Sequence, residues 1–479
     1  MSSTTTPDPR RWRALALVGT AFFMTILDVS IVNVALPSIA ADLEFSREGL
    51  QWVVTGYAIT FGGFLLLGGR AGDLLGRRRV FMTGLALFTL ASLACGLAVS
   101  ADMLVAARVV QGLGAAIVSP AALSIVSTMF AEGPERNKAL GIWGALGGSG
   151  AAIGVLAGGV LTEWAGWEWV FYVNVPVGVA VLALTVRLVP ESRAGVAHRS
   201  FDALGALTVT ASMMLLVFAI SKAPDVGWAT TRTIGTLAAA GALFVAFIVT
   251  ELRARHPLMP LSFFRIRSVA AANGLGLLLG ASVFANFFLL TLYVQQVLGF
   301  SALRAGLTFL ATAGTAVLAA GAAQAIATRL GPKPPMIAGF LLVAGGMLWY
   351  TQIPPSGSFG ADLLPGYLLV GVGLPFTFIP ISIAALAGVG ESQAGLASGL
   401  INTVQQVGGA LGVGVAATLA TSHFTTLLRS GESQPAALTG GFAWGFWLLL
   451  AFSLAGALAA LLFLRRDDVP QAEAVHVPA

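Results

Sequence analysis

The sequence predicts an all-α polytopic membrane protein, and three observations lead to this fold class. Hydrophobic residues make up 57% of the 479-residue chain and charged residues only 10%, with a mean hydropathy of +0.87. Such a composition does not describe the surface of a soluble protein. Apolar stretches of about 20 residues, the length of helix that crosses a bilayer, recur along the whole chain. The short loops between these stretches hold most of the basic residues.

Fourteen apolar stretches are long enough to be membrane-spanning helices. A spanning segment must be helical because unpaired backbone amides cannot be left in hydrocarbon. Each stretch ends at a charged or a Gly- and Pro-rich break, and the break at 388–393 is short and almost uncharged. The predicted spans are 15–36, 51–69, 80–99, 103–127, 138–161, 170–189, 204–222, 233–252, 268–291, 303–328, 335–352, 363–387, 395–421 and 441–464.

The distribution of basic residues predicts that both termini lie in the cytoplasm. Lys and Arg mark the cytoplasmic loops of membrane proteins. If the N-terminus is inside, 20 of the 26 Lys and Arg residues are inside, five are outside and one, Arg108, lies within a span. The inside set occupies positions 10, 11, 13, 70, 77–79, 136, 138, 187, 193, 199, 253, 255, 265, 267, 329, 333, 465 and 466. We therefore expect a multi-pass protein of the inner (cytoplasmic) membrane.

An internal repeat predicts two bundles of six helices. Arg47-Glu-Gly-Leu50 leads through an apolar helix to Leu75-Gly76-Arg77-Arg78, and Arg304-Ala-Gly-Leu307 leads similarly to Leu330-Gly331-Pro332-Lys333. Repeated halves in transporters place the substrate cavity between them near the midplane. The alternative is that any two apolar helices followed by basic turns look alike. The repeat divides the chain into a tail at 1–14, a bundle at 15–190, a linker with two helices at 191–262, a bundle at 263–464 and a tail at 465–479.

The first predicted helix carries a carboxylate, Asp28, within the motif LDVSIVNVALP. An ionised Asp at the bilayer centre costs at least about 2.5 to 3.5 kcal/mol, so it needs water, a partner or a proton. We predict that Asp28 couples transport to protons; the alternative is a carboxylate permanently neutralised by an arginine. Asn33 lies five residues further on, roughly 140° around the helix, and need not share the same face.

The fourth predicted helix carries Arg108 in the motif RVVQGLGAA. Since Asp28 is the one acidic residue that the sequence places clearly inside a span, the two side chains are natural partners. Gln111 follows one helical turn later and can complete a polar cluster.

The loop between the second and third predicted helices, GRAGDLLGRRRV, predicts a conformational latch. Gly69 and Gly76 permit a tight turn and close helix approach, and Asp73 can pair with Arg77. Such a loop can hold two bundles together on the cytoplasmic side. The alternative is a plain topology signal, which also applies.

The fifth predicted helix is rich in glycine, with Gly150, Gly154, Gly158 and Gly159. Small residues four apart let two helices pack backbone to backbone, so we expect a tight seam.

Polar residues within or near other spans are candidates for the lining of a substrate cavity. Each is equally explained as an interhelical hydrogen bond worth only about 0.6 kcal/mol. The candidates are Asn33, Gln111, Asn286, Gln296, Asn402 and Gln405.

These motifs, in this order, resemble the major facilitator superfamily, and specifically its fourteen-helix drug:proton antiporter branch. LDVSIVNVALP, GRAGDLLGRRRV and RVVQGLGAA look like the branch's first-helix motif, the superfamily's cytoplasmic loop and the branch's fourth-helix motif; QWVVTGYAIT and WEWVFYVNVP also look like this branch. The resemblance covers essentially the whole chain. It implies a major facilitator fold, proton-coupled export, Asp28 and Arg108 in coupling, and Asp73 with Arg77 in the latch. The chain departs from the pattern at Val155, where the branch usually has proline.

The function predicted by these features is proton-coupled export of small amphipathic or cationic compounds. An apolar cavity with one carboxylate offers affinity for both the substrate and the proton. The alternative is a transporter dedicated to a single metabolite or antibiotic; a non-transporting membrane sensor or an enzyme is disfavoured because the sequence has no phosphate-binding loop and no HExxH motif. We expect no cofactor, no metal and no nucleic-acid partner, and a monomer whose partners are protons, a small-molecule substrate and the lipid bilayer.

Overall fold

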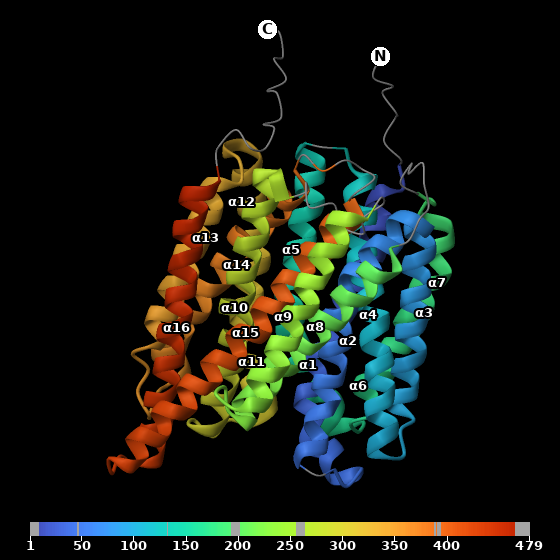
Figure 1. Cartoon of the computed structure of the whole chain (residues 1–479). Helices are drawn as coiled ribbons and strands as arrows, with labels where there is room; N and C mark the ends of the chain where they lie inside the picture. Colours follow the sequence, from blue (N-terminus) through green and yellow to red (C-terminus); the bar gives the residue numbers. More distant parts are fainter. Residues whose placement is uncertain are drawn as a thin grey trace.

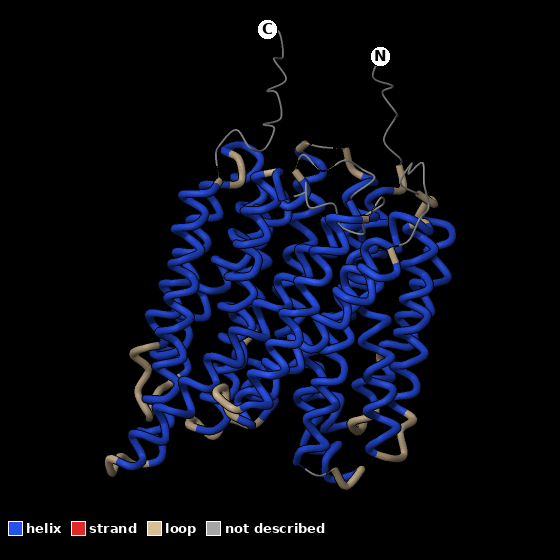
Figure 2. Tube along the Cα trace, viewed as in Figure 1, coloured by secondary structure: helices blue, strands red, loops and turns tan. Residues whose placement is uncertain are grey.

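The structure, a computed structural model, describes residues 9–45, 47–131, 133–192, 202–254, 264–387, 389 and 394–464. This described part is a bundle of long helices without a β-strand (Figures 1 and 2). In order, the helices are α1 (Arg11–Asp42), α2 (Arg47–Leu75), α3 (Arg77–Gly96), α4 (Ala101–Met129), α5 (Pro134–Trp164), α6 (Trp169–Tyr172), α7 (Asn174–Leu188), α8 (Ala203–Val226), α9 (Thr231–Arg253), α10 (Arg267–Gln296), α11 (Ala302–Thr308), α12 (Leu310–Leu330), α13 (Lys333–Tyr350), η2 (Phe359–Leu363), α14 (Leu364–Leu386), α15 (Ala394–Arg429) and α16 (Gln434–Phe463).

Both ends of the described chain lie at the same end of the bundle, which we call the terminal end (Figure 1). Hydrogen bonds tie these ends to neighbouring helices: Arg10 Nη1 donates to the carbonyl of Arg187, and Lys333 Nζ donates to the carbonyl of Leu464 at 2.7 Å. The helix α7 ends and α13 begins at the terminal end, as these two bonds show. Arg267 of α10 and Arg78 of α3 donate to the carbonyls of Phe463 and Val189, so α10 and α3 also begin there.

Eleven helical segments of the described residues are long and apolar enough to cross a membrane. The other three predicted spans fall on α5, α8 and α13. In α5 and α8 the apolar part within the described residues is short, Ile153–Trp164 and Leu204–Ile220, and α13 has 18 residues including Lys333 and two prolines. The chain is thus a multi-pass membrane protein, and the exact number of fourteen spans stays a prediction.

Glycines in a left-handed conformation separate the helices at two corresponding turns. Gly76, between α2 and α3, has φ 109°, and Gly331, between α12 and α13, has φ 79°. Residues with a Cβ rarely adopt these angles, so glycine sets both turns. The two turns are the ones that the sequence repeat aligns.

The contacts among α1–α7 recur among α10–α16. In the first set α1 packs on α5, α4 packs on both α2 and α3, and α3 packs on α7. In the second set α10 packs on α15, α14 packs on both α12 and α13, and α13 packs on α16. The same order of neighbours thus appears twice along the chain.

The helices α8 and α9 form a separate hairpin at the side of these two sets. α9 packs on α8, and α8 packs on α2 of the first set and on α15 of the second. Trp52 of α2 stacks on Phe218 of α8, and the indole of Trp228 donates to Thr418 Oγ1 of α15 at 2.5 Å. The hairpin therefore contacts both sets of helices.

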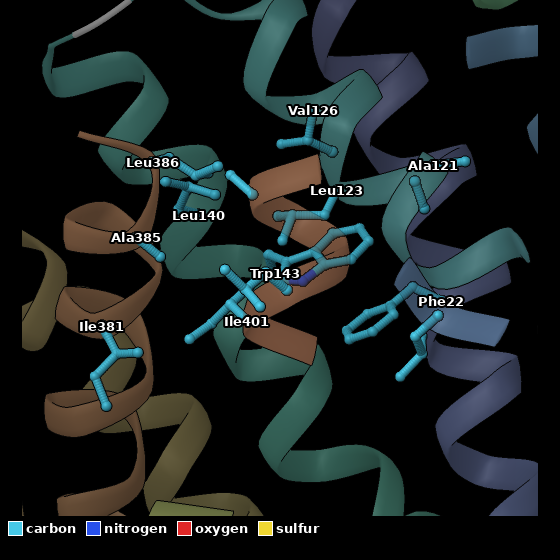
Figure 3. Packing of buried hydrophobic residues seen from close by; sticks show 14 of the residues in the cluster. Phe22, Ala121, Leu123, Val126, Leu140, Trp143, Ile381, Ala385, Leu386 and Ile401 are labelled. Atoms are coloured by element: carbon cyan, nitrogen blue, oxygen red, sulfur yellow. The ribbon is translucent and has the colours of Figure 1, made fainter. Parts of the chain in front are cut away.

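An apolar core joins the two sets around Trp143 of α5. The indole stacks on Phe22 of α1 with ring centroids 3.9 Å apart, and the Trp143 side chain is fully buried. Figure 3 shows it among side chains of α4 and, from the second set, Ile381 of α14 and Ile401 of α15. Between the two sets, α2 packs on α15 and α5 packs on α12 and α14.

Candidate functional site

The first element of the site is an ion pair buried inside the helical bundle. Arg108 Nη1 of α4 donates to Asp28 Oδ2 of α1 at 2.6 Å. The two side chains are 1% and 0% exposed. Asp28 and Arg108 thus lie together, as their sequence positions predict.

Two amides complete the hydrogen bonding of the carboxylate. Gln111 Nε2 of α4 donates to Asp28 Oδ1 at 2.8 Å, and Asn174 Nδ2 of α7 donates to the same oxygen at 3.1 Å. Ser92 Oγ of α3 accepts from both amides, at 3.1 and 3.0 Å, and donates to the carbonyl of Phe171. Residues from α1, α3, α4 and α7 therefore share one polar network, which we call the Asp28 network.

The guanidinium of Arg108 is held on its other sides by α2 and α6. Arg108 Nε donates to the backbone carbonyl of Val53 at 3.0 Å. The guanidinium carbon lies 4.2 Å from the centroid of the Tyr57 ring and 5.7 Å from that of Phe171. Cation–π contacts of this kind are strongest where the cation is desolvated. The arginine is therefore fixed by a carbonyl, two rings, a carboxylate and the amide oxygen of Gln111.

Every hydrogen bond that the structure gives the Asp28 carboxylate comes from a donor on a neighbouring side chain. An ionised Asp is an acceptor only, and Asp28 accepts three hydrogen bonds from three nitrogen donors. Removing two charges from water costs several kcal/mol per ion, and good geometry with additional hydrogen bonds offsets that cost. A change in the charge of Asp28 would therefore disturb the packing of four helices at once.

The sequence indicated Asp28, Arg108 and Gln111 but missed Ser92 and Asn174. In the sequence Asn174 is part of the WEWVFYVNVP motif, which gives no sign that it pairs with Asp28. Its position as the first residue of α7, after a helix break at Val173, points its amide to Asp28. A lone Ser in an apolar helix carries no signal that could have identified Ser92.

The second element lies at the terminal end, where α2 meets the beginning of α15. Arg77 Nη2 donates to Asp73 Oδ1 at 3.1 Å, and the backbone N–H of Leu396 donates to Asp73 Oδ2 at 3.0 Å. Both charged side chains are buried. A carboxylate at a helix N-terminus is favoured by the free N–H groups and by the helix dipole. Asp73 thus joins the two sets of helices.

Close backbone approach supports the same junction. A Cβ added to Gly399 of α15 would lie 3.4 Å from the Cα of Gly69 and 3.0 Å from the carbonyl of Leu65. Gly76 provides the turn that starts α3, where the Arg77 N–H donates to the carbonyl of Ser192. Three residues of the predicted latch, Gly69, Asp73 and Arg77, therefore lie at this junction, and the fourth, Gly76, forms the adjoining turn.

The glycines of α5 pack on α1. A Cβ at Gly154 would lie 2.8 Å from the carbonyl of Leu27, and one at Gly158 would lie 2.7 Å from that of Ile31. Gly150 faces Ile26, and Gly159 is buried. The seam predicted from the glycine spacing thus lies next to Asp28, along the helix that carries it.

The comparison of the sequence with protein families decides the classification. The family model described as Major Facilitator Superfamily matches residues 18–413. The chain belongs to the major facilitator superfamily. This match includes the Asp28 network, the Asp73 junction and the glycine seam.

Similar proteins are named for resistance to antibiotics or for their export. The chain is 37% identical to the puromycin resistance protein pur8 of Streptomyces alboniger, over 94% of this chain and 89% of that protein. It is 39% identical to the cephamycin export protein CmcT of Amycolatopsis lactamdurans, over 93% of this chain and 91% of that protein. Among solved structures, the human organic anion transporter MFSD10 (TETRAN) superposes with a TM-score of 0.66 and 17% identity, covering 95% of this chain and 100% of that one. That likeness shows the major facilitator fold.

The six candidate cavity residues of this major facilitator protein lie in different environments. Gln111 belongs to the Asp28 network, Asn33 is exposed and donates to the carbonyl of Val29 in its own helix, and Gln296 is exposed as the last residue of α10. No hydrogen bond among the described residues joins any two of the six. The cavity lining therefore stays a prediction.

The three remaining cavity candidates lie in α10 and α15. Asn402 donates to the carbonyl of Ser398 at 2.8 Å and accepts from Ser119 of α4 at 3.5 Å, so it links the two sets of helices. Gln405 is 8% exposed and packs on α10. Asn286 is 2% exposed, and its Oδ1 has no hydrogen-bond partner among the residues that the structure describes.

The second half of the chain has neutral residues at the positions that correspond to the ion pair. A Cβ at Gly412 of α15 would meet the carbonyl of Ala281, the residue before Ser282, as one at Gly154 of α5 would meet the carbonyl of Leu27, the residue before Asp28. Ser453 Oγ donates to Ser282 Oγ at 3.2 Å.

When α4 of the first half is aligned with α14 of the second half, a tyrosine occupies the position equivalent to Arg108. A Cβ added at Gly112 of α4 would meet Thr60 of α2, and one added at Gly371 of α14 would meet Thr315 of α12, so the two glycines correspond. Tyr367 and Arg108 each lie four residues before these glycines and therefore correspond to each other. The Tyr367 hydroxyl pairs with Thr308 Oγ1 at 3.0 Å. The two halves therefore share backbone packing but not the buried charges.

Among the described residues, no group of three or more His, Cys, Asp and Glu side chains is placed to hold a metal ion.

Proposed function

We propose that this major facilitator protein is a secondary transporter that exports small organic compounds in exchange for protons. The names of the curated relatives support export, since they are resistance and export proteins. The observation that carries the proton coupling is the buried Asp28–Arg108 pair, because ionisable residues within membrane spans are costly and typically mark functional sites.

The proposed architecture is two six-helix bundles with an inserted hairpin and both termini in the cytoplasm. The bundles are α1–α7 and α10–α16, and α8–α9 form the linker. Fourteen crossings result when the pairs α6–α7, α11–α12 and η2–α14 each count as one span and α5, α8 and α13 cross as well. The recurring helix contacts and the position of both described chain ends at one end of the bundle support this arrangement.

Protonation of Asp28 is the proposed coupling step. A proton on one oxygen neutralises the carboxylate and turns that oxygen into a donor, so it can no longer accept from its partner in the same geometry. The pair with Arg108 and the bonds from Gln111 and Asn174 then weaken together. Since these donors come from α4 and α7, the step changes how α1 packs against both helices. We propose that this change lets the first bundle rock relative to the second.

The described conformation is, in this proposal, closed toward the cytoplasm. The Asp73–Leu396 hydrogen bond and the apolar core around Trp143 join the two bundles on the terminal side. A further contact on that side runs from Asn137 of α5 to Thr328 of α12 at 3.2 Å. Opening toward the cytoplasm to take up substrate requires all three contacts to separate.

A second candidate is a transporter dedicated to one antibiotic or metabolite. It is favoured by the names of the curated relatives, since puromycin and cephamycin are each a single compound. The buried carboxylate fits both candidates, because it couples a proton to a substrate regardless of how many compounds the cavity accepts. Breadth of substrate is therefore a separate question from the mechanism.

The experiment is transport into inverted membrane vesicles that contain the protein, with an imposed proton gradient. The probes are a fluorescent cationic dye, puromycin and a cephamycin, each measured with and without a protonophore. Protonophore-sensitive uptake of all three indicates a broad exporter, and uptake of one indicates a dedicated exporter. Uptake that is unchanged by the protonophore would contradict proton coupling in both forms.

A further inference from the structure

Three residues on one face of α2 hold α4 at the level of the buried arginine. The carbonyl of Val53 accepts from Arg108 Nε at 3.0 Å, and the Tyr57 ring centroid lies 4.2 Å from the guanidinium carbon. About one turn further on, Thr60 Oγ1 donates to the carbonyl of Val109 at 2.9 Å. Residues spaced by four and three positions, as these are, lie on the same face of a helix. The arginine is therefore enclosed between its own helix and α2.

Tyr57 contacts both the charge and the backbone of α4. Its side chain is 2% exposed, and its hydroxyl donates to the carbonyl of Thr25 of α1 at 3.5 Å. A Cβ added at Gly112 of α4 would lie 2.5 Å from the carbonyl oxygen of Tyr57, so the two backbones approach closely there. Protein interiors are close-packed, and a contact between a cation and a ring is strongest where the cation is desolvated. A shift of Arg108 therefore displaces the Tyr57 ring as well.

The second bundle has a threonine at the position equivalent to Tyr57. A Cβ added at Gly371 of α14 would meet the carbonyl oxygen and the Cα of Thr312, as one at Gly112 would meet those of Tyr57. The equivalent of Arg108 in that bundle is Tyr367, which carries no charge. The ring thus lies in the half of the chain that has the buried cation, which favours a role tied to that charge.

The same helix continues from the arginine to the Asp73 junction. α2 is one unbroken helix without a proline, and about 24 Å separates Tyr57 from Asp73 along it at 1.5 Å per residue. At its terminal end Asp73 accepts from the N–H of Leu396, and Gly69 lies against Gly399 of α15. Packed helices of this kind carry a displacement from one site to another. A movement of α2 at Tyr57 therefore reaches the contact between the two bundles.

We propose that Tyr57 is a positioning residue that passes the charge state of Asp28 through α2 to the Asp73 junction. The proposal rests on the proposed function, in which a proton neutralises Asp28. Arg108 then keeps the Val53 carbonyl and the Tyr57 ring, both of α2, while its pair with α1 weakens. The arginine therefore moves with α2, the end of α2 at Asp73 shifts against α15, and the junction opens.

The test is a double-mutant cycle on the purified full-length protein in detergent, without substrate or gradient. The reporter is Ser398→Cys, next to Gly399 and fully buried, and the measured quantity is its rate of reaction with a maleimide. The native Cys95 is buried too, so the chain without the reporter gives the background. Asp28→Asn represents the neutral carboxyl group.

The effect of Asp28→Asn is measured in four backgrounds: native, Tyr57→Leu, Tyr57→Phe and Trp52→Leu. Tyr57→Phe is the conservative change, since it keeps the ring and loses only the hydroxyl. Trp52→Leu is the matched control, because Trp52 is another aromatic residue of α2 and stacks on Phe218 of α8.

We expect Asp28→Asn to raise the labelling rate about tenfold in the native background, a typical size for coupling between two sites. Tyr57→Phe and Trp52→Leu should keep this ratio, and Tyr57→Leu should reduce it to about twofold or less. A variant that only loosens the junction raises the rate with and without Asp28→Asn, so it leaves the ratio unchanged. The ratio therefore separates a positioning role from a purely structural one.

Three results would overturn the proposal: no increase with Asp28→Asn in the native background, the native ratio in Tyr57→Leu, or loss of the ratio in Tyr57→Phe. The vesicle experiment keeps these apart from the proposed function. Uptake that stays protonophore-sensitive while the ratio is the same in Tyr57→Leu removes the role of Tyr57 alone. If Tyr57→Leu does not fold in detergent, Tyr57→Met replaces it with the same expected loss, because it also lacks a ring.

Discussion

Arg108 of α4 donates to Asp28 of α1 over 2.6 Å, and neither side chain exposes more than 1% of its surface. Because the pair is closed off from solvent, each charge depends on the other for its stability in the membrane. The pair is also the point where four helices of the first half meet through Gln111, Asn174 and Ser92. A proton at this point can therefore change the packing of a whole bundle.

Removal of one charge should destabilise the protein more than removal of both. Arg108→Gln leaves the Asp28 carboxylate buried without its cation, and breaking a buried pair costs about 3 to 5 kcal/mol. The double variant Asp28→Asn/Arg108→Gln leaves two neutral amides and should recover much of that loss. Thermal unfolding in detergent measures both. Equal unfolding temperatures for the single and double variants would contradict an energetic dependence of Arg108 on Asp28.

Asn174→Ala should slow proton-driven transport without abolishing it. The variant leaves Asp28 Oδ1 with Gln111 as its amide donor and removes a partner of Ser92. A lost hydrogen bond to a charged group corresponds to about 1.5 to 3 kcal/mol. We expect the pH dependence of transport to shift, which a purely structural defect would not produce.

The matched control for Asn174→Ala is Asn33→Ala. Asn33 is an exposed asparagine of α1 that donates to the carbonyl of Val29 in its own helix. Its loss should leave the pH profile unchanged. A shifted profile in Asn33→Ala, or an unshifted one in Asn174→Ala, would remove Asn174 from the coupling network.

Asp73→Ala should open the junction at the terminal end. The backbone N–H of Leu396 and the guanidinium of Arg77 then lose their shared acceptor, so the contact between α2 and α15 weakens. A cysteine placed at Asn137, at the edge of the contact between α5 and α12, should react faster with a maleimide in this variant. Glu135→Gln is the control, because the Glu135 side chain, which pairs with Arg11, is half exposed, and exposed ion pairs contribute little to stability. Equal labelling of Asp73→Ala and the wild type would contradict a latch.

A side chain at Gly154 should disrupt the seam next to the coupling site. Its Cβ would lie 2.8 Å from the carbonyl of Leu27, the residue before Asp28. Gly154→Val should therefore lower both stability and transport, since a rigid backbone cannot move aside locally. Gly235→Val on α9, where a Cβ meets nothing within 4 Å, should leave transport unchanged. Transport at the wild-type rate in Gly154→Val would show that α1 and α5 do not need this close approach.

Charge in an apolar context made part of the site predictable. Placing the charges of Asp28 and Arg108 within apolar spans costs free energy, so the sequence predicts that the two side chains pair. Gln111 follows Arg108 by one helical turn, which predicts that it lies near the pair. Ser92 and Asn174 carry no charge, and their participation depends on how α3 and α7 pack against α1 and α4. Such packing is set by the whole bundle rather than by local sequence.

The fold was predictable to a similar extent. Hydropathy predicted a helix at every span that the structure shows as helical. The composition did not indicate that the sixth predicted span is interrupted at Val173 or that the tenth is interrupted at Phe309. The polar residues of the second half were not decisive, because an amide in a span serves equally as cavity lining or as interhelical contact. Asn402, for example, bonds with Ser119 of the other half.

The most direct measurement compares Asp28→Asn with the wild type in two assays on the same proteoliposomes, using a substrate identified in the vesicle experiment. One assay is substrate exchange without a proton gradient, and the other is accumulation driven by an imposed gradient. If Asp28 carries the proton, Asp28→Asn should exchange substrate at a rate comparable to that of the wild type and should fail to accumulate it against a gradient. Accumulation by Asp28→Asn to the wild-type ratio would contradict the account.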